Sequence, residues 1–378
     1  MNCTRILVFA TAILLHISCN KKLANERVIW TKQLDSLVTQ EHQSAHFHGG
    51  IIVSKDSEVI YEKYIGIANR GSSTPIDWQT KFDIASVNKS FICALILKAV
   101  EGGKLSLNDK LVDVLKGYSF GGSFHSEITI HHLMCHLSGL PDYDAIDIDL
   151  KENSFKKFKG SSFTNPEYVD FISRLTPVNA PNTSFHYSNF AYHLLAIILE
   201  NTYQQSFDVV LSKNLTKPLG LNQTVAEMHS RNNITNLADG YLFDKTNNHW
   251  NKQMDIDLSL GRRIFSTVHD LNRWGQVMSN PGYLSEQSLA LMQTNHLAKI
   301  TKEVSYGYGW AIFDENKGGR MGNLNINKKY IIHGGSTDGY KAMLVNINNN
   351  EYVISFLSNH GYEEELSLTK KIVNILKL

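Results

Sequence analysis

The chain has 378 residues, of which 42% are hydrophobic, 10% are aromatic and only 7 are proline. Enough apolar side chains are present to bury a large core, which excludes a disordered tail and a fibrous protein. Its 37 Lys and Arg nearly balance 36 Asp and Glu, giving a formal charge of +1. Because the chain has neither an excess nor a run of basic residues, a strongly basic nucleic-acid-binding protein is excluded as well.

The N-terminus has the pattern of an export signal. Arg5 precedes an apolar run at residues 6–17, which is shorter than the roughly 20 residues that a membrane-spanning helix needs. This pattern predicts a signal peptide over residues 1–18. Ser18 followed by Cys19 resembles the cleavage site of bacterial lipoproteins, so we expect Cys19 to be lipidated. The predicted location is the bacterial envelope, as a lipid-anchored lipoprotein, with a periplasmic or secreted protein as the alternative.

Strands are predicted near both ends of the mature chain, after a lead-in at residues 19–44. Runs of β-branched and aromatic residues between turn residues predict these strands at 49–54, 58–65, 342–347 and 352–357. Apolar residues at helical spacing predict helices at 27–41, 87–101, 130–136, 166–175, 189–201, 207–215 and 366–376. This order predicts an α+β fold, with an antiparallel β-sheet flanked by helices and an all-helical lobe. The Asn- and Asp-rich stretch 230–260 is expected to be an insertion or a lid.

The cysteines and histidines do not form a metal-binding pattern. Cys93 and Cys135 lie in apolar helical segments, where buried free thiols are expected. His132 and His136 are four residues apart on a predicted helix, a spacing that can chelate zinc. No further ligand follows at a metal spacing, so we expect neither a metal nor a cofactor.

The first candidate for chemistry is Ser86, at the start of an apolar helix, with Lys89 three residues later. Residues at i and i+3 share a helix face, so the amine can approach the hydroxyl. The helix N-terminus adds free N–H groups that suit an oxyanion, and a desolvated lysine can act as a base. Alone, the pair is a weak pattern, for which an N-capping serine beside a solvated lysine would be the better interpretation.

Two further motifs accompany this pair. Tyr187 stands two residues before Asn189, at the head of another apolar helix. The segment 333–336, His-Gly-Gly-Ser, ends a predicted strand with two glycines, whose missing side chains let a substrate lie against the backbone. In this order and spacing, the three motifs resemble those of the serine β-lactamase and penicillin-binding-protein superfamily, specifically its class C branch. That branch has Ser-x-x-Lys, Tyr-x-Asn, and Lys-Thr-Gly or His-x-Gly.

The resemblance covers nearly the whole mature chain and predicts one hydrolase domain over residues 45–378. Several linking segments look like blocks of the family, among them Phe82–Ser86, Glu101–Leu107, Ile128–Leu133, Ser138–Pro141, Pro218–Leu221, Ser266–Thr267 and Tyr306–Trp310. The fold that the resemblance implies is the β-lactamase/transpeptidase-like fold.

The resemblance also implies a role for each motif residue. Ser86 would be the acylated nucleophile, Lys89 its activating neighbour, and Tyr187 the general acid or base that passes the proton to the leaving group. The implied oxyanion hole is formed by the backbone N–H groups of Ser86 and Ser336. The implied substrate-binding residues are Asn189, His333, Gly335 and Ser336.

Two positions depart from the family pattern. Where many β-lactamases have a lysine, this chain has His333, which is mostly neutral above a pKa of about 6.5. That difference favours esters, amides or peptides over β-lactams, and it predicts that activity on carboxylate-bearing substrates rises toward pH 6. Arg262 and Arg263 stand near a position where relatives have glycine. They could supply the missing cation, but we favour the interpretation that both are solvated.

The sequence therefore predicts a serine hydrolase that acts through an acyl-enzyme on ester, amide or D-amino-acid peptide substrates. The alternatives are a penicillin-binding or sensing module that is acylated but turns over slowly, and a true β-lactamase. A scaffold with an inactive site ranks last, because all of the motif residues are present. The expected partners are a small-molecule or peptide substrate and, through the lipid anchor alone, a membrane; no nucleic acid is expected.

Overall fold

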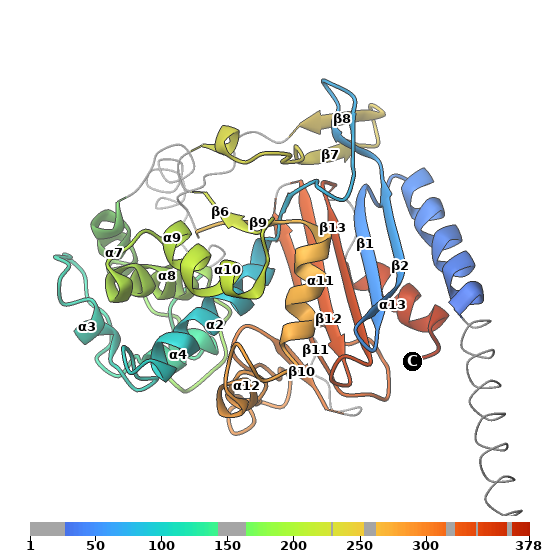
Figure 1. Ribbon diagram of the computed structural model, residues 1–378. Coiled ribbons are helices and arrows are strands. Elements are labelled where there is room, and N and C mark those ends of the chain that lie inside the picture. The colour runs from blue at the N-terminus through green and yellow to red at the C-terminus, as the bar shows by residue number, and fades with distance from the viewer. Residues whose placement is uncertain are drawn as a thin grey trace, which may run out of the picture.

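The computed structural model describes residues 27–142, 164–227, 230–252, 262–314, 322–337, 339–360 and 365–378. The predicted signal peptide and the predicted lipidation at Cys19 lie outside these residues. A sheet region and a helical region stand side by side (Figure 1), which confirms the predicted α+β fold. Among the helices that the structure describes, none is both long and apolar enough to cross a membrane.

The central sheet is antiparallel and brings the two ends of the chain together. Its strands, in spatial order, are β10 (Ala311–Phe313), β11 (Tyr330–Thr337), β12 (Tyr340–Ile347), β13 (Tyr352–Ser358), β1 (Gly49–Lys55) and β2 (Glu58–Ile65). The four strands predicted from the sequence are all present, each within two residues of its predicted bounds. β1 pairs with β13 along its whole length, from Gly49 opposite Ser358 to Lys55 opposite Tyr352.

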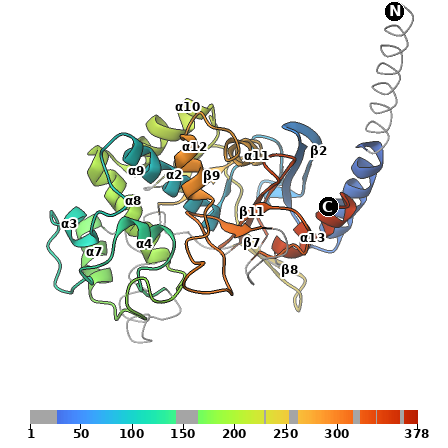
Figure 2. The same cartoon turned by 90° about the horizontal axis from the view of Figure 1, so that it is seen from below.

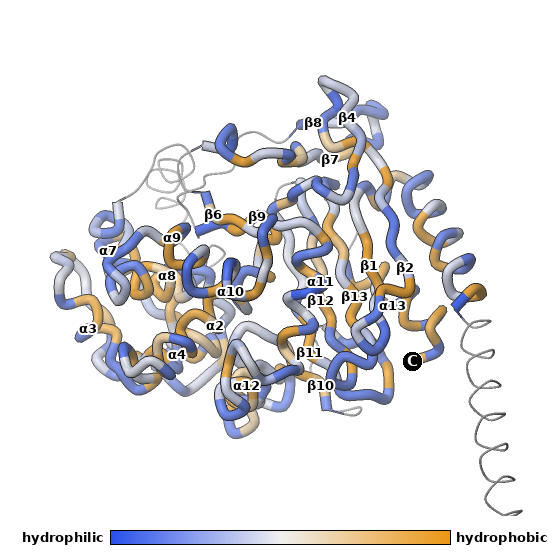
Figure 3. The backbone as a smooth tube through the Cα atoms, viewed as in Figure 1, coloured by the Kyte–Doolittle hydropathy of each residue, from blue (hydrophilic) through white to orange (hydrophobic). Residues whose placement is uncertain are grey.

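Helices cover both faces of the sheet (Figures 1 and 2). On one face lies α11 (Val268–Val277), and on the other lie the helix at residues 27–43 and α13 (Glu365–Ile375). α11 can pack closely because Gly275 faces the sheet, where a Cβ atom would come within 2.8 Å of side-chain atoms of Leu344 and Val353. The apolar stretches of the chain gather between these layers (Figure 3).

The helical region is built around two buried helices. Its elements are α2 (Asn88–Glu101), α3 (Leu111–Val114), α4 (Ile130–Met134), α7 (Asn165–Ser173), α8 (Asn189–Tyr203), α9 (Phe207–Leu211), a π-helix (Ser212–Thr216) and α10 (Lys217–Leu219), with α12 (Glu286–Met292) against α2. α2 and α8 are hydrophobic on nearly all sides, which is typical of a helix buried in a core. Cys93 on α2 and Cys135 after α4 are buried free thiols, as expected.

The stretch 230–260 is not the open loop predicted from its composition. It contains a two-stranded hairpin, β7 (Tyr241–Asp244) and β8 (His249–Lys252). These strands are only four residues long, and β8 is mainly polar, so the pair shows no clear strand pattern in the sequence. Residues 253–260 lie outside the described part of the chain, so the predicted lid is not described there.

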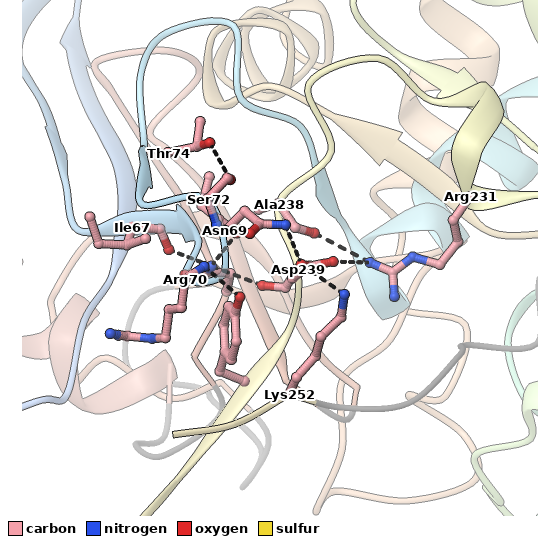
Figure 4. Close-up of polar contacts among 12 residues, drawn as sticks. Ile67, Asn69, Arg70, Ser72, Thr74, Arg231, Ala238, Asp239 and Lys252 are labelled. Atoms are coloured by element: carbon pink, nitrogen blue, oxygen red, sulfur yellow. Dashed lines mark hydrogen bonds and ion pairs between the residues drawn. The ribbon is translucent and has the colours of Figure 1, made fainter. Parts of the chain in front are cut away.

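A polar network fixes this hairpin against a second one, formed by β3 (Ile67–Asn69) and β4 (Thr74–Pro75) (Figure 4). The Asp239 carboxylate accepts a hydrogen bond from Asn69 Nδ2 at 2.7 Å and pairs with Lys252 Nζ at 2.9 Å. The Arg70 guanidinium lies 3.7 Å from the ring centre of Trp250 on β8. The two hairpins therefore close over one end of the central sheet as a unit.

Gly309 provides a test of how tightly the sheet region packs on α2. It has a φ of +75°, and a Cβ atom there would lie 2.7 Å from the carbonyl oxygen of Lys89. Gly103, with a φ of +66° and nothing within 4 Å, shares the backbone conformation without the crowding. Gly103→Ala should cost about 1 kcal/mol of unfolding free energy, and Gly309→Ala about 1 to 3 kcal/mol more. Equal losses in chemical denaturation of the two variants would contradict the close approach.

Candidate active site

Ser86 lies on a strained turn between the two regions. It follows β5 (Phe82–Asp83) and belongs to a short 3-10 turn, Ala85–Val87, that leads directly into α2. Ala85 has a φ of +47°, a left-handed conformation that costs a residue with a Cβ atom about 1 kcal/mol or more. The surroundings must therefore hold the turn, and Asp83 Oδ1 does so by accepting a hydrogen bond from Ala85 N at 2.7 Å.

Gly335 on β11 packs against this turn from the sheet side. A Cβ atom at Gly335 would lie 2.6 Å from the carbonyl oxygen of Ile84 and 3.0 Å from Ser86 N. Only glycine fits so close to the backbone, and the next residue, Ser336, is exposed. β10 pairs only with residues 330–332 of β11, so from His333 onward this edge has no strand partner among the described residues.

Lys89 is buried behind Ser86, with 3% of its surface exposed. Its Nζ atom donates hydrogen bonds to Ser86 Oγ at 3.1 Å and to Asn189 Oδ1 at 2.8 Å. Burial lowers the pKa of Lys89 to about 7, although the negative charge of Asp142 opposes that shift. A large fraction of the amine is therefore neutral near pH 7, which is the state that a general base needs.

Tyr187 approaches the same hydroxyl. Its phenol group makes a hydrogen bond with the Ser86 side chain, and its ring centre lies 4.9 Å from Lys89 Nζ. Burial raises the pKa of Tyr187 well above its usual value, so the phenol keeps its proton at neutral pH. The two opposite shifts favour Lys89 as the base and Tyr187 as a proton donor.

His136, which no motif placed in the site, supports the ring of Tyr187. His136 is completely buried, and its ring stacks on Tyr187 with centres 4.3 Å apart. Its Nδ1 atom accepts a hydrogen bond from Ser188 N at 3.1 Å. His136 thus fixes both the ring and the following backbone, a role that its spacing from His132 in the sequence did not indicate.

His333 differs from the expectation that its ring becomes charged near pH 6. The ring is buried, its Nδ1 atom donates to the Gly334 carbonyl oxygen at 2.6 Å, and its Nε2 atom accepts from the Tyr306 hydroxyl at 3.0 Å. Burial lowers the pKa of His333 to about 3, and the nearby charge of Lys89 acts in the same direction. The imidazole is therefore neutral over the whole physiological range.

Neither arginine of the pair Arg262–Arg263 is solvated, so that interpretation is wrong. The Arg262 side chain is buried, lies 3.0 Å from a carboxylate oxygen of Glu200, and also hydrogen-bonds Asn165. Arg263 Nη1 lies 2.6 Å from Asp83 Oδ2, the same carboxylate that holds the turn before Ser86. Arg263 therefore supports the nucleophile turn through Asp83.

The described ranges of the chain contain no group of three or more His, Cys, Asp or Glu side chains arranged to hold a metal ion. His132 instead accepts a hydrogen bond from Thr129 N at 3.2 Å and caps α4. The structure brings Ser86, Lys89, Tyr187 and Asn189 together around one hydroxyl. This constellation is suited to nucleophilic attack by an activated serine.

The model of the Beta-lactamase family matches residues 34–376. The chain belongs to the β-lactamase family. This confirms the resemblance drawn from the three motifs and places the chain among serine hydrolases of the β-lactamase fold.

Individual relatives are distant but aligned over most of the chain. Penicillin-binding protein 4* of Bacillus subtilis is 25% identical over 91% of this chain and 76% of its own length. Protein flp of Staphylococcus aureus strain MRSA252 is 24% identical over 88% of this chain; the chain spans only 63% of that longer protein.

Solved structures show the same fold. The octameric penicillin-binding protein homologue from Pyrococcus abyssi superposes with a TM-score of 0.75 at 23% identity, covering 92% of this chain and 77% of that one. EstCE1, described as a hydrolase with promiscuous acyltransferase activity, gives 0.74 at 17% identity over 93% and 99%. D-amino acid amidase from Ochrobactrum anthropi gives 0.73 at 18% identity over 92% and 99%.

Arg263 tests the support of the nucleophile turn. Arg263→Gln leaves the buried Asp83 carboxylate without its ion pair, so the free energy of unfolding should fall by about 2 to 4 kcal/mol. Labelling of Ser86 by a fluorophosphonate should slow at the same time, because the turn is less firmly held. Arg174→Gln, which breaks an exposed pair with Asp170 on α7, should change neither property. Wild-type stability and labelling in Arg263→Gln would rule out this supporting role.

Proposed function

We propose that this protein is a serine hydrolase that forms an acyl-enzyme at Ser86 and acts on neutral esters, amides or D-amino-acid peptides. The observation that carries the proposal is the buried Lys89 amine, 3.1 Å from Ser86 Oγ with a pKa of about 7. A serine hydroxyl is a weak nucleophile unless an adjacent base takes its proton. Lys89 is placed and tuned to be that base.

The proposed reaction consists of acylation of Ser86 and hydrolysis of the acyl-enzyme. Lys89 takes the Ser86 proton while Oγ bonds to the substrate carbonyl carbon, and the oxyanion faces the N–H groups of Ser86 and Ser336. The carbon–heteroatom bond then breaks, and the leaving group takes a proton relayed through Tyr187. A water molecule then attacks the resulting ester and loses a proton to the same basic groups. Ser86 Oγ takes a proton back as the acid leaves, which restores the hydroxyl.

The charges around the site support a neutral substrate. Lys89 is engaged with Ser86 and Asn189, and the His333 ring is neutral with both nitrogen atoms bonded. Arg262 and Arg263 are paired with buried carboxylates away from the hydroxyl. A substrate carboxylate therefore finds no dedicated cation among these groups. The similar folds of EstCE1 and of the D-amino acid amidase are in keeping with ester and amide chemistry.

We also propose that the protein is exported and anchored by a lipid on Cys19, after removal of residues 1–18. Support comes from the apolar run at residues 6–17 and from the Ser18–Cys19 junction. Within the described residues, the helix at 27–43 is the first element of the folded domain.

Turnover tests the proposed function directly. The wild-type protein should hydrolyse short-chain p-nitrophenyl esters over many cycles, and a fluorophosphonate should label Ser86 in mass spectrometry. Ser86→Ala should abolish both, whereas Ser72→Ala, which removes an exposed hydroxyl between β3 and β4, should change neither. A single stoichiometric burst without turnover would indicate a sensing module instead. Absence of any label on Ser86 would refute the nucleophile assignment.

The preference between carboxylate-bearing and neutral substrates should not change near neutral pH, because the His333 ring stays neutral there. Because the pKa of His333 is lowered to about 3, the ratio of kcat/KM for nitrocefin to that for p-nitrophenyl acetate should stay constant within about twofold between pH 6 and 8. His333→Lys should raise the ratio by supplying a cation. A ratio that rises several-fold toward pH 6 in the wild type, but not in His333→Gln, would show that the ring does become charged.

A further inference from the structure

Asp142 lies beside the candidate site, although no motif pointed to it. It follows the segment Ser138–Pro141, which is tied to the head of α8 because Ser188 Oγ donates a hydrogen bond to the Pro141 carbonyl oxygen at 2.7 Å. The Asp142 carboxylate therefore faces the first residue of α8, Asn189. It accepts hydrogen bonds from Asn189 N at 3.0 Å and from Asn189 Nδ2 at 3.2 Å and 3.0 Å, one to each oxygen.

These contacts determine how the Asn189 amide is oriented. An asparagine side chain presents two donor hydrogens on one side and an acceptor oxygen on the other. With Nδ2 directed at Asp142, Oδ1 is left to accept from Lys89 Nζ at 2.8 Å. In the flipped orientation, the amide oxygen would face a carboxylate and the amide N–H groups would face an amine. Both contacts would then be unfavourable.

We infer that Asp142 is a positioning residue of this site: its carboxylate holds the Asn189 amide in the orientation that keeps the Lys89 amine against Ser86. The inference rests on the proposed acyl-enzyme chemistry. It connects four side chains in a line, from the Asp142 carboxylate through the Asn189 amide and the Lys89 amine to the Ser86 hydroxyl.

The carboxylate acts on the site through its charge as well. Burial of Lys89 lowers its pKa, and the negative charge of Asp142 raises it again. The same charge raises the pKa of Tyr187. Asp142 therefore holds Lys89 at the balance between the protonated and neutral forms, and its removal should push the pKa of Lys89 further down.

The test is the pH profile of Ser86 acylation, measured as the rate of fluorophosphonate labelling on the full-length protein between pH 5.5 and 9. In the wild type, the rate should rise with pH as Lys89 loses its proton, with a midpoint near 7. Asp142→Asn removes the charge at nearly constant shape, so the midpoint should move about one pH unit lower. The plateau rate should fall about tenfold or more, because an amide cannot orient Asn189 as a carboxylate does.

Two variants separate charge from position. Asp142→Glu keeps the charge but displaces it, so the midpoint should stay near the wild-type value while the plateau falls. Asp170→Asn removes an exposed carboxylate on α7 that pairs with Arg174, and it should leave both quantities unchanged. In a double-mutant cycle, the losses from Asp142→Asn and Asn189→Ala should not add, because both break the same line of contacts.

Different results would contradict the positioning role of Asp142 and the proposed acylation of Ser86. An unchanged midpoint in Asp142→Asn, with only a lower melting temperature, would overturn the inference and leave a helix-capping role. If Asp142→Asn fails to fold, wild-type labelling by Asp142→Glu would overturn it equally. If the wild type itself is not labelled at Ser86, the proposed function fails instead.

Discussion

The site depends on keeping one amine out of water. An ammonium group loses several kcal/mol of hydration when it is buried without a partner. Lys89 is compensated by hydrogen bonds to Ser86 and Asn189, by the carboxylate beyond Asn189, and by two aromatic rings, of Tyr187 and Tyr192, whose centres lie 4.9 and 5.3 Å from Nζ. Most residues of α2 and α8, the helices that carry Lys89 and Asn189, are buried, and this packing keeps water away from the amine. The resulting low polarity brings the amine to its useful protonation state. A wetter, looser interface would return Lys89 to an ordinary cation that cannot accept a proton.

Two arginines near the site, one buried and one partly buried, have a structural role. Arg263 is paired with Asp83 beneath the nucleophile turn, and Arg262 is paired with Glu200 on α8. Because these arginines are adjacent in sequence, a single short segment is bound both to the turn that carries Ser86 and to the helix that carries Asn189. Such pairs contribute little net stability compared with apolar packing, but breaking one is costly. They therefore fix the relative placement of the Ser86 turn and α8 more than they strengthen the fold.

Much of the fold and of the candidate site could be predicted because the deciding signals are local. The strands of β1, β2, β12 and β13 and the helices of the lobe each show their own periodicity, and Ser86, Lys89, Tyr187 and Asn189 stand in short motifs. The errors concern properties set by distant partners. His333 is neutral because of burial and the nearby charge of Lys89, and the arginines are paired because Asp83 and Glu200 meet them in space. Asp142 was missed because it belongs to none of the three motifs, and its contacts with Asn189 join residues that are distant in the sequence.

The pairing of β1 with β13 means that the site can be assembled only late in the synthesis and folding of the chain. Gly49 lies opposite Ser358, so the sheet joins segments from nearly opposite ends of the chain. β11, which supplies Gly335, belongs to the same sheet and is separated from β13 by β12. Contacts of such large sequence separation form late and slowly, because the entropy of closing a long loop must be overcome before any of them is gained. The strained turn at Ser86 obtains its opposing wall only after the C-terminal strands have been synthesised and docked. A partly made chain therefore carries the nucleophile but no site around it.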